Sequence, residues 1–347
     1  MKKVLFIVNP ISGSGKKLTV YRQIRRYADR TRLDYSVCHT KYAGHASELA
    51  QQAVREGYGI VVAVGGDGTI NEVARAVVHT PTALGIIPCG SGNGLARHLQ
   101  IPLDAPKAIR IINEAVIHCL DYGKIDGRPF FCTCGVGFDA FISLKFADSG
   151  RRGPRTYVEN VLREGLTYKP ETYIIENPEG TERYEAFLIA CANASQYGNN
   201  AYIAPQASMK DGLMDVIVME PFNALEAPQI AVQLFNKTLP SNSHIKTFQT
   251  RRIRILRPAE GPVHCDGDPF VAGREIDVEL IPASFNVVVN PNAHGRNKNF
   301  LQLMNEDILH WWQGQQEELR RQQTVVKRLN RNLLGKLRGD KGERPGE

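Results

Sequence analysis

The sequence feature that most constrains the fold is a glycine-rich turn placed directly after an apolar run. Residues 60–64 are all apolar, and residues 65–69 read Gly-Gly-Asp-Gly-Thr. The apolar run predicts a buried strand, and apolar residues at helical spacing over 70–78 predict a helix behind the turn. Thr69 and Glu72 have the spacing of a capping box at the start of that helix. We therefore expect the turn between the carboxyl end of a strand and the amino end of a helix.

Two interpretations of this turn are open. Free backbone N–H groups and the helix dipole favour a phosphate group at the amino end of a helix. Asp67 would repel a phosphate directly, so this interpretation places a divalent metal ion between the two. The structural alternative is a tight turn in which glycine only permits a positive φ angle. The acid and the capping pattern favour the phosphate site.

Two further turns have the same character. The apolar runs 4–8 and 83–88 are followed by glycine-containing segments, 9–17 and 89–94, which open helical patterns. Segment 9–17 is not a Walker A loop, because Pro10 replaces the first glycine. With a strand expected at 33–39, four strands alternate with helices, which predicts a parallel, doubly wound α/β sheet. In such a sheet these turns meet at one edge, so three of them together predict a nucleoside triphosphate site.

Beyond residue 117 the pattern changes to short strand-like runs separated by turns, with few helical stretches. Many short strands without alternating helices predict an antiparallel β-sandwich. We therefore expect three parts in this chain. They are an α/β nucleotide-binding domain over residues 1–125, a β-sandwich substrate domain over 126–292 and a basic helical tail over 293–347.

The charge of the chain is concentrated in the tail. The net charge is +7, and residues 313–347 supply +4 of it from nine Lys/Arg and five Asp/Glu, so the rest is only mildly basic and no nucleic-acid partner is expected. Val326, Leu329, Leu333 and Leu337 are spaced three or four residues apart, which predicts an amphipathic basic helix. Such a helix can lie on an anionic membrane surface. The alternatives are a packed helix or a self-association element, and a homodimer is therefore one option.

The cysteines and the length of the apolar runs indicate the cellular compartment in which the protein is expected. Seven cysteines without a C-x-x-C pair read as thiols of a reducing compartment. No apolar run approaches the roughly 20 residues that a membrane-spanning helix needs, and the sequence opens with a strand pattern instead of a signal peptide. We expect a cytoplasmic protein, or one that binds peripherally to the inner face of the membrane.

Five motifs, in order, resemble the diacylglycerol/sphingosine lipid kinase superfamily. They are Asn9-Pro10 with Ser12-Gly13, Gly65–Glu72, Gly90–Asn93, Pro205–Gly212 and Cys265–Pro269. The resemblance covers about residues 1–290 and leaves the tail unmatched. It implies an α/β nucleotide domain and a β-sandwich that receives the lipid, with the active site in the cleft between them. The last strand of the family often packs back toward the first domain, which would be residues 285–290 here.

The resemblance also implies cofactors and site residues, with ATP and Mg²⁺ as the cofactors. The ATP-binding residues would be Asn9, Ser12, Thr40, Gly65, Gly66, Asp67, Gly68, Thr69, Asn71 and Ser91. Asp67 would contact the magnesium ion of the nucleotide, and Asp121 would support that metal. Asp211, with the backbone carbonyls of Ser208 and Leu213, matches a second and more structural metal site.

The general base of the family is the acid that ends an Asp-Gly-Glu motif, and Asp268 stands at that position here, one methylene shorter. A carboxylate of either length can accept the proton of the attacking hydroxyl if it reaches hydrogen-bonding range. The segment Asp266-Gly267-Asp268 also has the composition of a hairpin turn, since Asp-Gly favours primed turns. A second departure is Gly94, where many members carry an acid.

Three functions remain open at this point. The leading one is an ATP- and magnesium-dependent kinase that phosphorylates a hydroxyl of diacylglycerol, a sphingoid base or a related lipid at a membrane surface. The second is an NAD kinase or another kinase of a soluble substrate with the same glycine turn. The first turn, the motif at 265–269 and the basic tail argue against it. The third is a nucleotide- or lipid-binding regulatory protein without catalysis, which the departures at Gly94 and Asp268 keep open.

Overall fold

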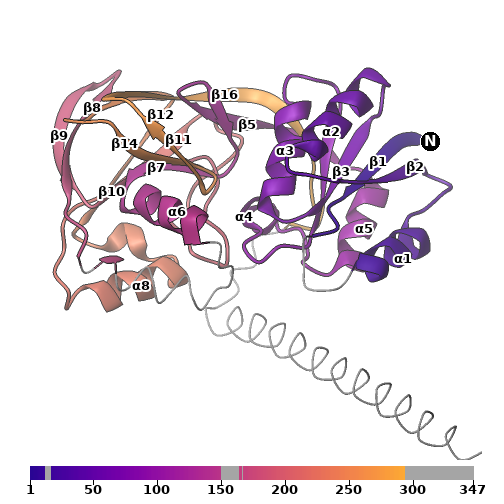
Figure 1. The fold of residues 1–347 in the computed structure, drawn as a ribbon, viewed down its shortest axis with the longest axis horizontal. Coiled ribbons are helices and arrows are strands. Elements are labelled where there is room, and N and C mark those ends of the chain that lie inside the picture. Colours follow the sequence, from indigo (N-terminus) through magenta and orange to yellow (C-terminus); the bar gives the residue numbers. More distant parts are fainter. Residues whose placement is uncertain (12–16, 150–163, 166, 294–347) are drawn as a thin grey trace, which may run out of the picture. The chain divides into compact units, whose positions relative to one another are not determined.

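The computed structural model describes residues 1–11, 17–149, 164–165 and 167–293 (Figure 1). The tail beyond residue 293, for which we predicted a helix, lies outside the described residues, and so does Ser12 of the first turn. The described chain has an α/β half followed by a half built of two packed sheets.

Four parallel strands form the sheet of the first half, in the order β2-β1-β3-β4. Their bounds are β1 Lys2–Val8, β2 Leu33–His39, β3 Ile60–Gly65 and β4 Ala83–Pro88. Every residue of β3 and β4 is buried, because helices cover both faces of the sheet. The doubly wound α/β sheet predicted from the alternating pattern is confirmed.

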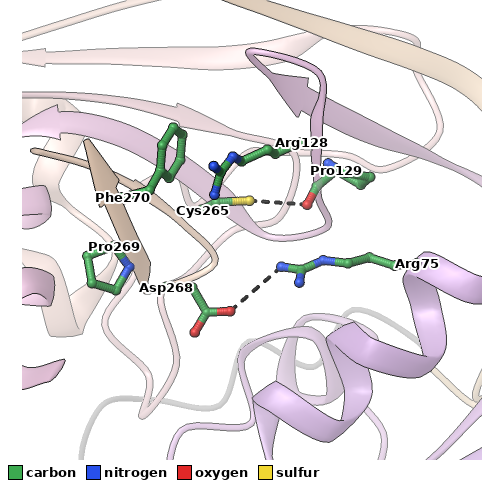
Figure 2. A pocket seen from close by; sticks show the side chains of 7 residues that line it. All are labelled: Arg75, Arg128, Pro129, Cys265, Asp268, Pro269 and Phe270. Carbon is green, nitrogen blue, oxygen red and sulfur yellow. Dashed lines mark hydrogen bonds and ion pairs between the residues drawn. The ribbon is translucent and has the colours of Figure 1, made fainter. Parts of the chain in front are cut away.

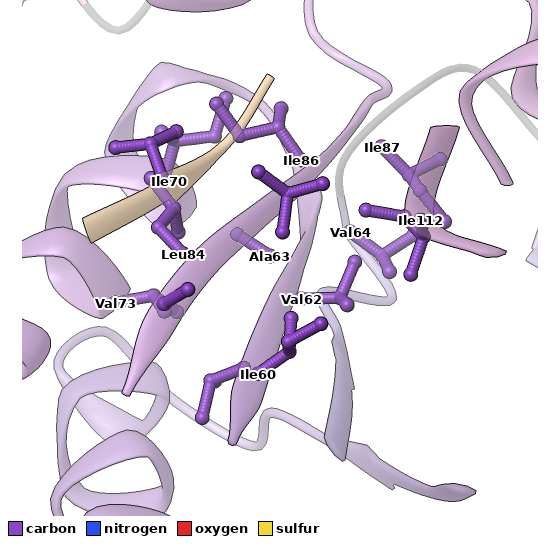
Figure 3. Packing of buried hydrophobic residues seen from close by; sticks show 14 of the residues in the cluster. Ile60, Val62, Ala63, Val64, Ile70, Val73, Leu84, Ile86, Ile87 and Ile112 are labelled. Atoms are coloured by element: carbon purple, nitrogen blue, oxygen red, sulfur yellow. The ribbon is translucent and has the colours of Figure 1, made fainter. Parts of the chain in front are cut away.

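Two pairs of helices cover this sheet, α2 with α3 on one face and α1 with α5 on the other (Figure 1). Their bounds are α1 Lys17–Tyr27, α2 His45–Arg55, α3 Asp67–Val77 and α5 Ala105–Glu114, and the short α4 spans Gly94–His98. Figure 3 shows Val62 and Val64 of β3 beside Ile112 of α5. Ile70 and Val73 of α3 lie on the other side of the strands. Alternate side chains of each strand thus fill the two layers of one core.

The second half is a β-sandwich, as predicted. One sheet has six antiparallel strands in the order β12-β11-β10-β7-β14-β15. These are β7 Thr133–Gly137, β10 Leu188–Ala192, β11 Met214–Met219, β12 Ile245–Thr250, β14 Gly261–Cys265 and β15 Asp268–Ala272. The facing strands are β5 Ile117–Ile125, β6 Arg128–Phe130, β8 Glu171–Asn177, β9 Gly180–Ala186, β13 Arg252–Leu256 and β16 Glu275–Val288. Buried apolar side chains from both sheets form a single core.

One strand, β16, belongs to both halves. It pairs antiparallel with β13 and β5, and near its end Val287 lies opposite Leu84 of β4 in a parallel pairing. The pairing with β5 changes register between Ile281 and Phe285, where Ala283 has a φ angle of 47°. A bulge of this kind bends a strand. The bend allows β16 to pair with the sandwich strands and with the parallel sheet.

Helices also cover the outer face of the six-stranded sheet. α6 (Phe138–Ser149), α8 (Ala227–Asn236) and the 3₁₀ turn Leu239–Ser241 contribute to a third apolar cluster there, with alternate residues of β10 and β11. Within the part of the chain that the structure describes, none of the helices has the length and apolar character to cross a membrane.

Asp121, in β5, is a buried carboxylate that fixes two segments at the junction of the halves. It is 3% exposed. Its Oδ1 accepts the N–H of Ala283 in the bulge at 2.8 Å, and its Oδ2 accepts the N–H of Gly212 at 2.9 Å. Its own N–H donates to the carbonyl of Met209 at 2.8 Å. Bonds to a charged acceptor are stronger than neutral ones, so Asp121 stabilises both the bulge and the loop at 209–212.

His98, the last residue of α4, is a second connection between the halves. Its Nδ1 accepts the backbone N–H of Ser195 at 3.0 Å. Desolvation lowers the pKa of His98 from 6.5 to about 4. A ring nitrogen that accepts a hydrogen bond must be unprotonated, so the folded state requires neutral His98.

We predict that Asp121→Ala destabilises the fold because it removes the buried, charged acceptor of two backbone N–H groups, those of Gly212 and Ala283. The expected loss is about 3–6 kcal/mol of unfolding free energy, from roughly 1.5–3 kcal/mol for each hydrogen bond to a charged acceptor. Urea denaturation of the variant and of the exposed control Asp34→Ala measures it. The loss should be the same with and without EDTA. A loss that vanishes in EDTA would assign the effect of Asp121 to a metal ion instead.

We predict that His98 makes the fold acid-sensitive. Because the folded pKa lies below the ordinary value, the stabilisation is present above about pH 6.5 and is lost as the pH falls toward 4. The loss is on the order of 1–3 kcal/mol. His98→Asn keeps an acceptor for Ser195 but cannot titrate, so its urea midpoint should fall less between pH 7 and 4.5 than that of the wild type. An equal fall in both proteins would contradict this role.

Candidate active site

The turns after β3 and β4 lie directly against each other. A Cβ atom on Gly90 would lie 2.6 Å from the Cα of Gly66, which only glycine avoids. The carboxylate of Asp67 joins the same two turns, since its Oδ2 accepts the N–H of Asn93 and its Oδ1 that of Gly94, both at 2.8 Å. The two glycine-rich turns therefore form one backbone unit at the amino end of α3.

The turn after β1 is bonded to this unit through Asn9. The Asn9 Nδ2 donates to the Thr69 Oγ1 at 2.9 Å, and the Asn9 N–H donates to the carbonyl of Val64 at 2.9 Å. Thr40, which follows β2, is buried and donates its N–H to the carbonyl of Val8. The predicted convergence of these turns on one edge of the sheet is thus present in the structure.

The other residues that were predicted to bind ATP differ in their exposure to solvent. Asn71 is buried within α3, and Ser91 is exposed at the tip of the turn after β4. A Cβ atom on Gly68 would have no atom within 4 Å, so the first turn of α3 faces open space there. Ser12 lies outside the described residues.

The capping box predicted from Thr69 and Glu72 is wrong. α3 begins at Asp67 with Gly66 as its N-cap, and this cap residue has no side chain that could accept a hydrogen bond. Glu72 accepts instead the N–H groups of Gly44 and Ala46 at 2.9 and 3.0 Å, and so caps the neighbouring helix α2. Sequence spacing identified a capping glutamate but not which helix it caps, because that depends on how α2 and α3 pack.

Asn93 is a site residue that the sequence interpretation did not assign. It has a left-handed φ of 53°, its Oδ1 accepts the N–H of Gly90 at 3.1 Å and its Nδ2 donates to the carbonyl of Gly90 at 2.7 Å. The signal was available, since asparagine tolerates this conformation better than most residues and often closes such turns.

The segment at 265–269 is a hairpin turn that also carries the predicted base. Asp266 and Gly267 have φ angles of 52° and 84°, as in a type I′ turn, between β14 and β15. The Asp266 carboxylate is buried and accepts three backbone N–H groups, from Phe131 at 2.8 Å, Cys132 at 2.7 Å and Thr133 at 3.1 Å. Desolvation raises the pKa of Asp266 to about 6, although these hydrogen bonds lower it. Asp266 therefore anchors the turn, and Asp268 follows it as the first residue of β15.

Asp268 lies next to α3 and lines a pocket of about 320 Å³ (Figure 2). Its Oδ2 forms an ion pair with the guanidinium of Arg75 at 3.6 Å, and its side chain is 66% exposed. The other residues of the pocket are Arg128, Pro129, Cys265, Pro269 and Phe270. Desolvation by the surrounding walls raises the pKa of Asp268, Arg75 lowers it, and Glu72 and Asp67 raise it further.

A buried histidine supports the turn from behind. The Gly267 N–H donates to the His264 Nδ1 at 3.4 Å, so the proton of the ring is on Nε2, which donates to the Asp139 Oδ2 at 3.0 Å. The Tyr197 hydroxyl donates to the same carboxylate oxygen at 3.1 Å. His264 is 2% exposed and alternates with Val263 and Cys265 of the sandwich core, so this network lies on the outer face of the six-stranded sheet beneath α6, and His264 does not line the pocket.

Gly94 has a packing reason to be glycine. A Cβ atom there would lie 3.0 Å from the carbonyl oxygen of Tyr197, and one on Gly198 would lie 3.1 Å from Gly92. The backbone at 197–198 thus lies on the turn after β4, and an acidic side chain at position 94 would require that backbone to move. The departure at Gly94 follows from this close approach.

The residues predicted for a second metal site share one loop. The Asp211 Oδ1 accepts the Leu213 N–H at 3.2 Å, and the Ser208 Oγ accepts the Lys210 N–H at 3.2 Å. Asp121 holds this loop, and both of its oxygens already accept N–H groups. Among the residues with described positions, no three or more His, Cys, Asp or Glu side chains are grouped as a metal site would require.

Both halves of the chain match families of known proteins. Residues 3–125 match the family model of the diacylglycerol kinase catalytic domain, and residues 132–289 match that of the YegS C-terminal NAD kinase β-sandwich-like domain. A diacylglycerol kinase structure from Bacillus anthracis superposes with a TM-score of 0.67 at 22% identity, over 84% of this chain and 98% of that one, which shows a shared fold.

Curated relatives agree with these matches. A protein named "Probable lipid kinase YegS-like" from Serratia proteamaculans is 26% identical, over 83% of this chain and 94% of the relative. One with the same name from Chromohalobacter salexigens is 30% identical, over 65% of this chain and 75% of the relative. The chain therefore belongs to the family of lipid kinases with a diacylglycerol kinase catalytic domain and a YegS-type β-sandwich.

Proposed function

We propose that this protein is an ATP-dependent kinase in which Asp268 accepts the proton of a lipid hydroxyl while the γ-phosphoryl group is transferred to that oxygen. The observation that carries the proposal is the position of Asp268. The hairpin turn of the sandwich brings its carboxylate to Arg75 in the last turn of α3, the helix that begins at the joined glycine turns, and Asp67 of the first turn acts on it electrostatically. Phosphoryl transfer to a hydroxyl requires a base that can reach the acceptor oxygen, and Asp268 lies against the same helix as the proposed phosphate site.

The amino end of α3 is the proposed phosphate site. The N–H groups of its first turn and the helix dipole favour the anionic phosphates of ATP. Gly68 leaves this turn open, and Asn9 and Thr69 hold the neighbouring turn in place. Because transfer depends chiefly on positioning and charge neutralisation, the rigid backbone unit of the two turns is the main contribution of this half.

The residues at the turn fit a magnesium ion bound together with the nucleotide. Each oxygen of Asp67 accepts one backbone N–H and retains a lone pair that a metal ion can use. Magnesium keeps several waters and takes one or two carboxylates plus phosphate oxygens. When bound, it would neutralise charge on the phosphates. Asp211, with the carbonyls of Ser208 and Leu213, remains the proposed second and structural site.

The pocket beside Asp268 is the proposed place of the acceptor hydroxyl. Pro129, Pro269 and Phe270 give it apolar walls, and Arg128 lies over the ring of Phe270 at 4.1 Å. The acceptor is diacylglycerol, a sphingoid base or a related lipid presented at a membrane surface. The basic tail is the proposed membrane contact, because its composition suits an anionic surface.

The central prediction concerns Asp268→Asn, which keeps the shape of the side chain but cannot accept a proton. Turnover of labelled ATP onto lipid should fall by about 10²–10⁴-fold, the usual contribution of a general base. ATP affinity, measured by calorimetry, should stay within about two-fold, and the exposed control Asp34→Asn should keep full activity. Wild-type turnover in Asp268→Asn would reject Asp268 as the base.

A second assay identifies the acceptor class. Mixed micelles that contain diacylglycerol, monoacylglycerol, ceramide or sphingosine are incubated with labelled ATP and magnesium, and NAD is the soluble control. We expect label in a lipid and none in NAD. Label in NAD alone would favour the soluble-substrate kinase, and ATP binding without transfer to any acceptor would favour the regulatory protein.

A further inference from the structure

The ion pair between Arg75 and Asp268 joins an element of the nucleotide-binding half to the turn that carries the proposed base. Arg75 lies on α3 and Asp268 begins β15, so the two residues are brought together only by the tertiary fold. The nitrogen–oxygen distance of 3.6 Å is that of an ion pair without a short hydrogen bond. The side chain of Arg75 is 36% exposed, so it retains part of its hydration.

The pairing uses only one oxygen of the carboxylate. Arg75 contacts Oδ2, and Figure 2 shows the second oxygen of Asp268 turned away from the guanidinium. A carboxylate oxygen that is not used by Arg75 can accept the hydrogen bond of an incoming hydroxyl. Arg75 therefore restrains Asp268 without occupying the atom that the reaction needs.

Among the charged side chains that act on Asp268, Arg75 is the cation and the others are acids of the same helix. Gly68, Glu72 and Arg75 are four and three residues apart and share one face of α3. The ionisable groups around Asp268 are Asp67, Glu72 and Arg75 of α3, Arg128 of the pocket wall, and Asp266 and Cys265 of its own hairpin. Desolvation, Glu72 and Asp67 raise the pKa of Asp268, whereas Arg75 lowers it. The phosphates of ATP would add further negative charge to this region.

We propose that Arg75 is a positioning residue for the reaction, which holds the Asp268 carboxylate against α3 and keeps it ionised when the nucleotide is bound. This inference rests on the proposed role of Asp268 as the base. The phosphate-binding turn at the start of α3 and the carboxylate of Asp268 belong to different halves of the chain but must act on the same phosphoryl group. Arg75 lies on α3 and forms the ion pair with Asp268. Its effect is exerted through Asp268 and not through contact with the reacting atoms.

The test is a comparison of Arg75→Met and Arg75→Lys with the wild type, using diacylglycerol micelles and the other lipids of the panel. Arg75→Met keeps most of the apolar stem but removes the charge. We expect kcat to fall about 10-fold, with KM for ATP and for the lipid each within about two-fold. The acidic limb of the pH–rate profile should move toward higher pH by about 0.5 to 1, because loss of a nearby cation disfavours the ionised base.

Arg75→Lys should restore part of kcat and return the acidic limb of the pH–rate profile most of the way to its wild-type position. Lysine supplies the positive charge but not the planar guanidinium group. The matched control is Arg110→Met, an exposed arginine on α5, which covers the opposite face of the sheet. Circular dichroism and urea midpoints establish that all variants fold. An unchanged kcat and pH profile in Arg75→Met would overturn the proposal. A rise of KM for the lipid alone would also overturn it, since that result makes Arg75 a substrate contact.

Failure of this inference and failure of the proposed function can be told apart. If Asp268→Asn is inactive and Arg75→Met resembles the wild type, Asp268 remains the base and Arg75 has no positioning role. If Asp268→Asn turns over normally, the proposed base is wrong, and the inference on Arg75 falls with it.

Discussion

The backbone contact between Gly66 and Gly90 is the constraint on which the site depends. Because neither residue has a Cβ, the turns after β3 and β4 touch, and the Asp67 carboxylate can reach the N–H groups of Asn93 and Gly94. That bridge fixes the start of α3, and α3 in turn carries Arg75 to the Asp268 hairpin. The placement of Arg75 in the pocket beside Asp268 thus depends on a close approach between two strand-to-helix turns.

The hairpin at 265–269 shows how one segment can satisfy a structural and a functional interpretation together. Its Asp-Gly pair forms the primed turn that its composition favours, and the buried Asp266 carboxylate holds that turn with three backbone N–H groups. A turn anchored in this way presents the following residue, Asp268, in a defined position. The hairpin interpretation is therefore compatible with the proposed role of Asp268 as the base.

Two residues that the family pattern singles out, Gly94 and Asp121, have local structural roles in this chain. Gly94 leaves space for the backbone of Tyr197, so an acid there would conflict with the contact between the two loops. Asp121, expected to support a metal ion, donates and accepts backbone bonds that hold the bulge of β16 and the loop at 209–212. Both residues stabilise the junction of the two halves, where β16 passes from the sandwich to the parallel sheet.

The sequence by itself determined the elements and their order. Apolar runs, glycine turns and helical spacing depend on neighbouring residues, so they predicted the α/β sheet, the sandwich and the convergence of the turns that follow Val8, Val64 and Pro88. Only the tertiary structure decided which distant side chains meet. Glu72 caps α2 and not its own helix, because α2 and α3 pack side by side. Arg75 faces Asp268 because the fold brings α3 to the hairpin of the sandwich. No local pattern encodes such pairings, since both residues look like ordinary polar positions on an exposed helix face.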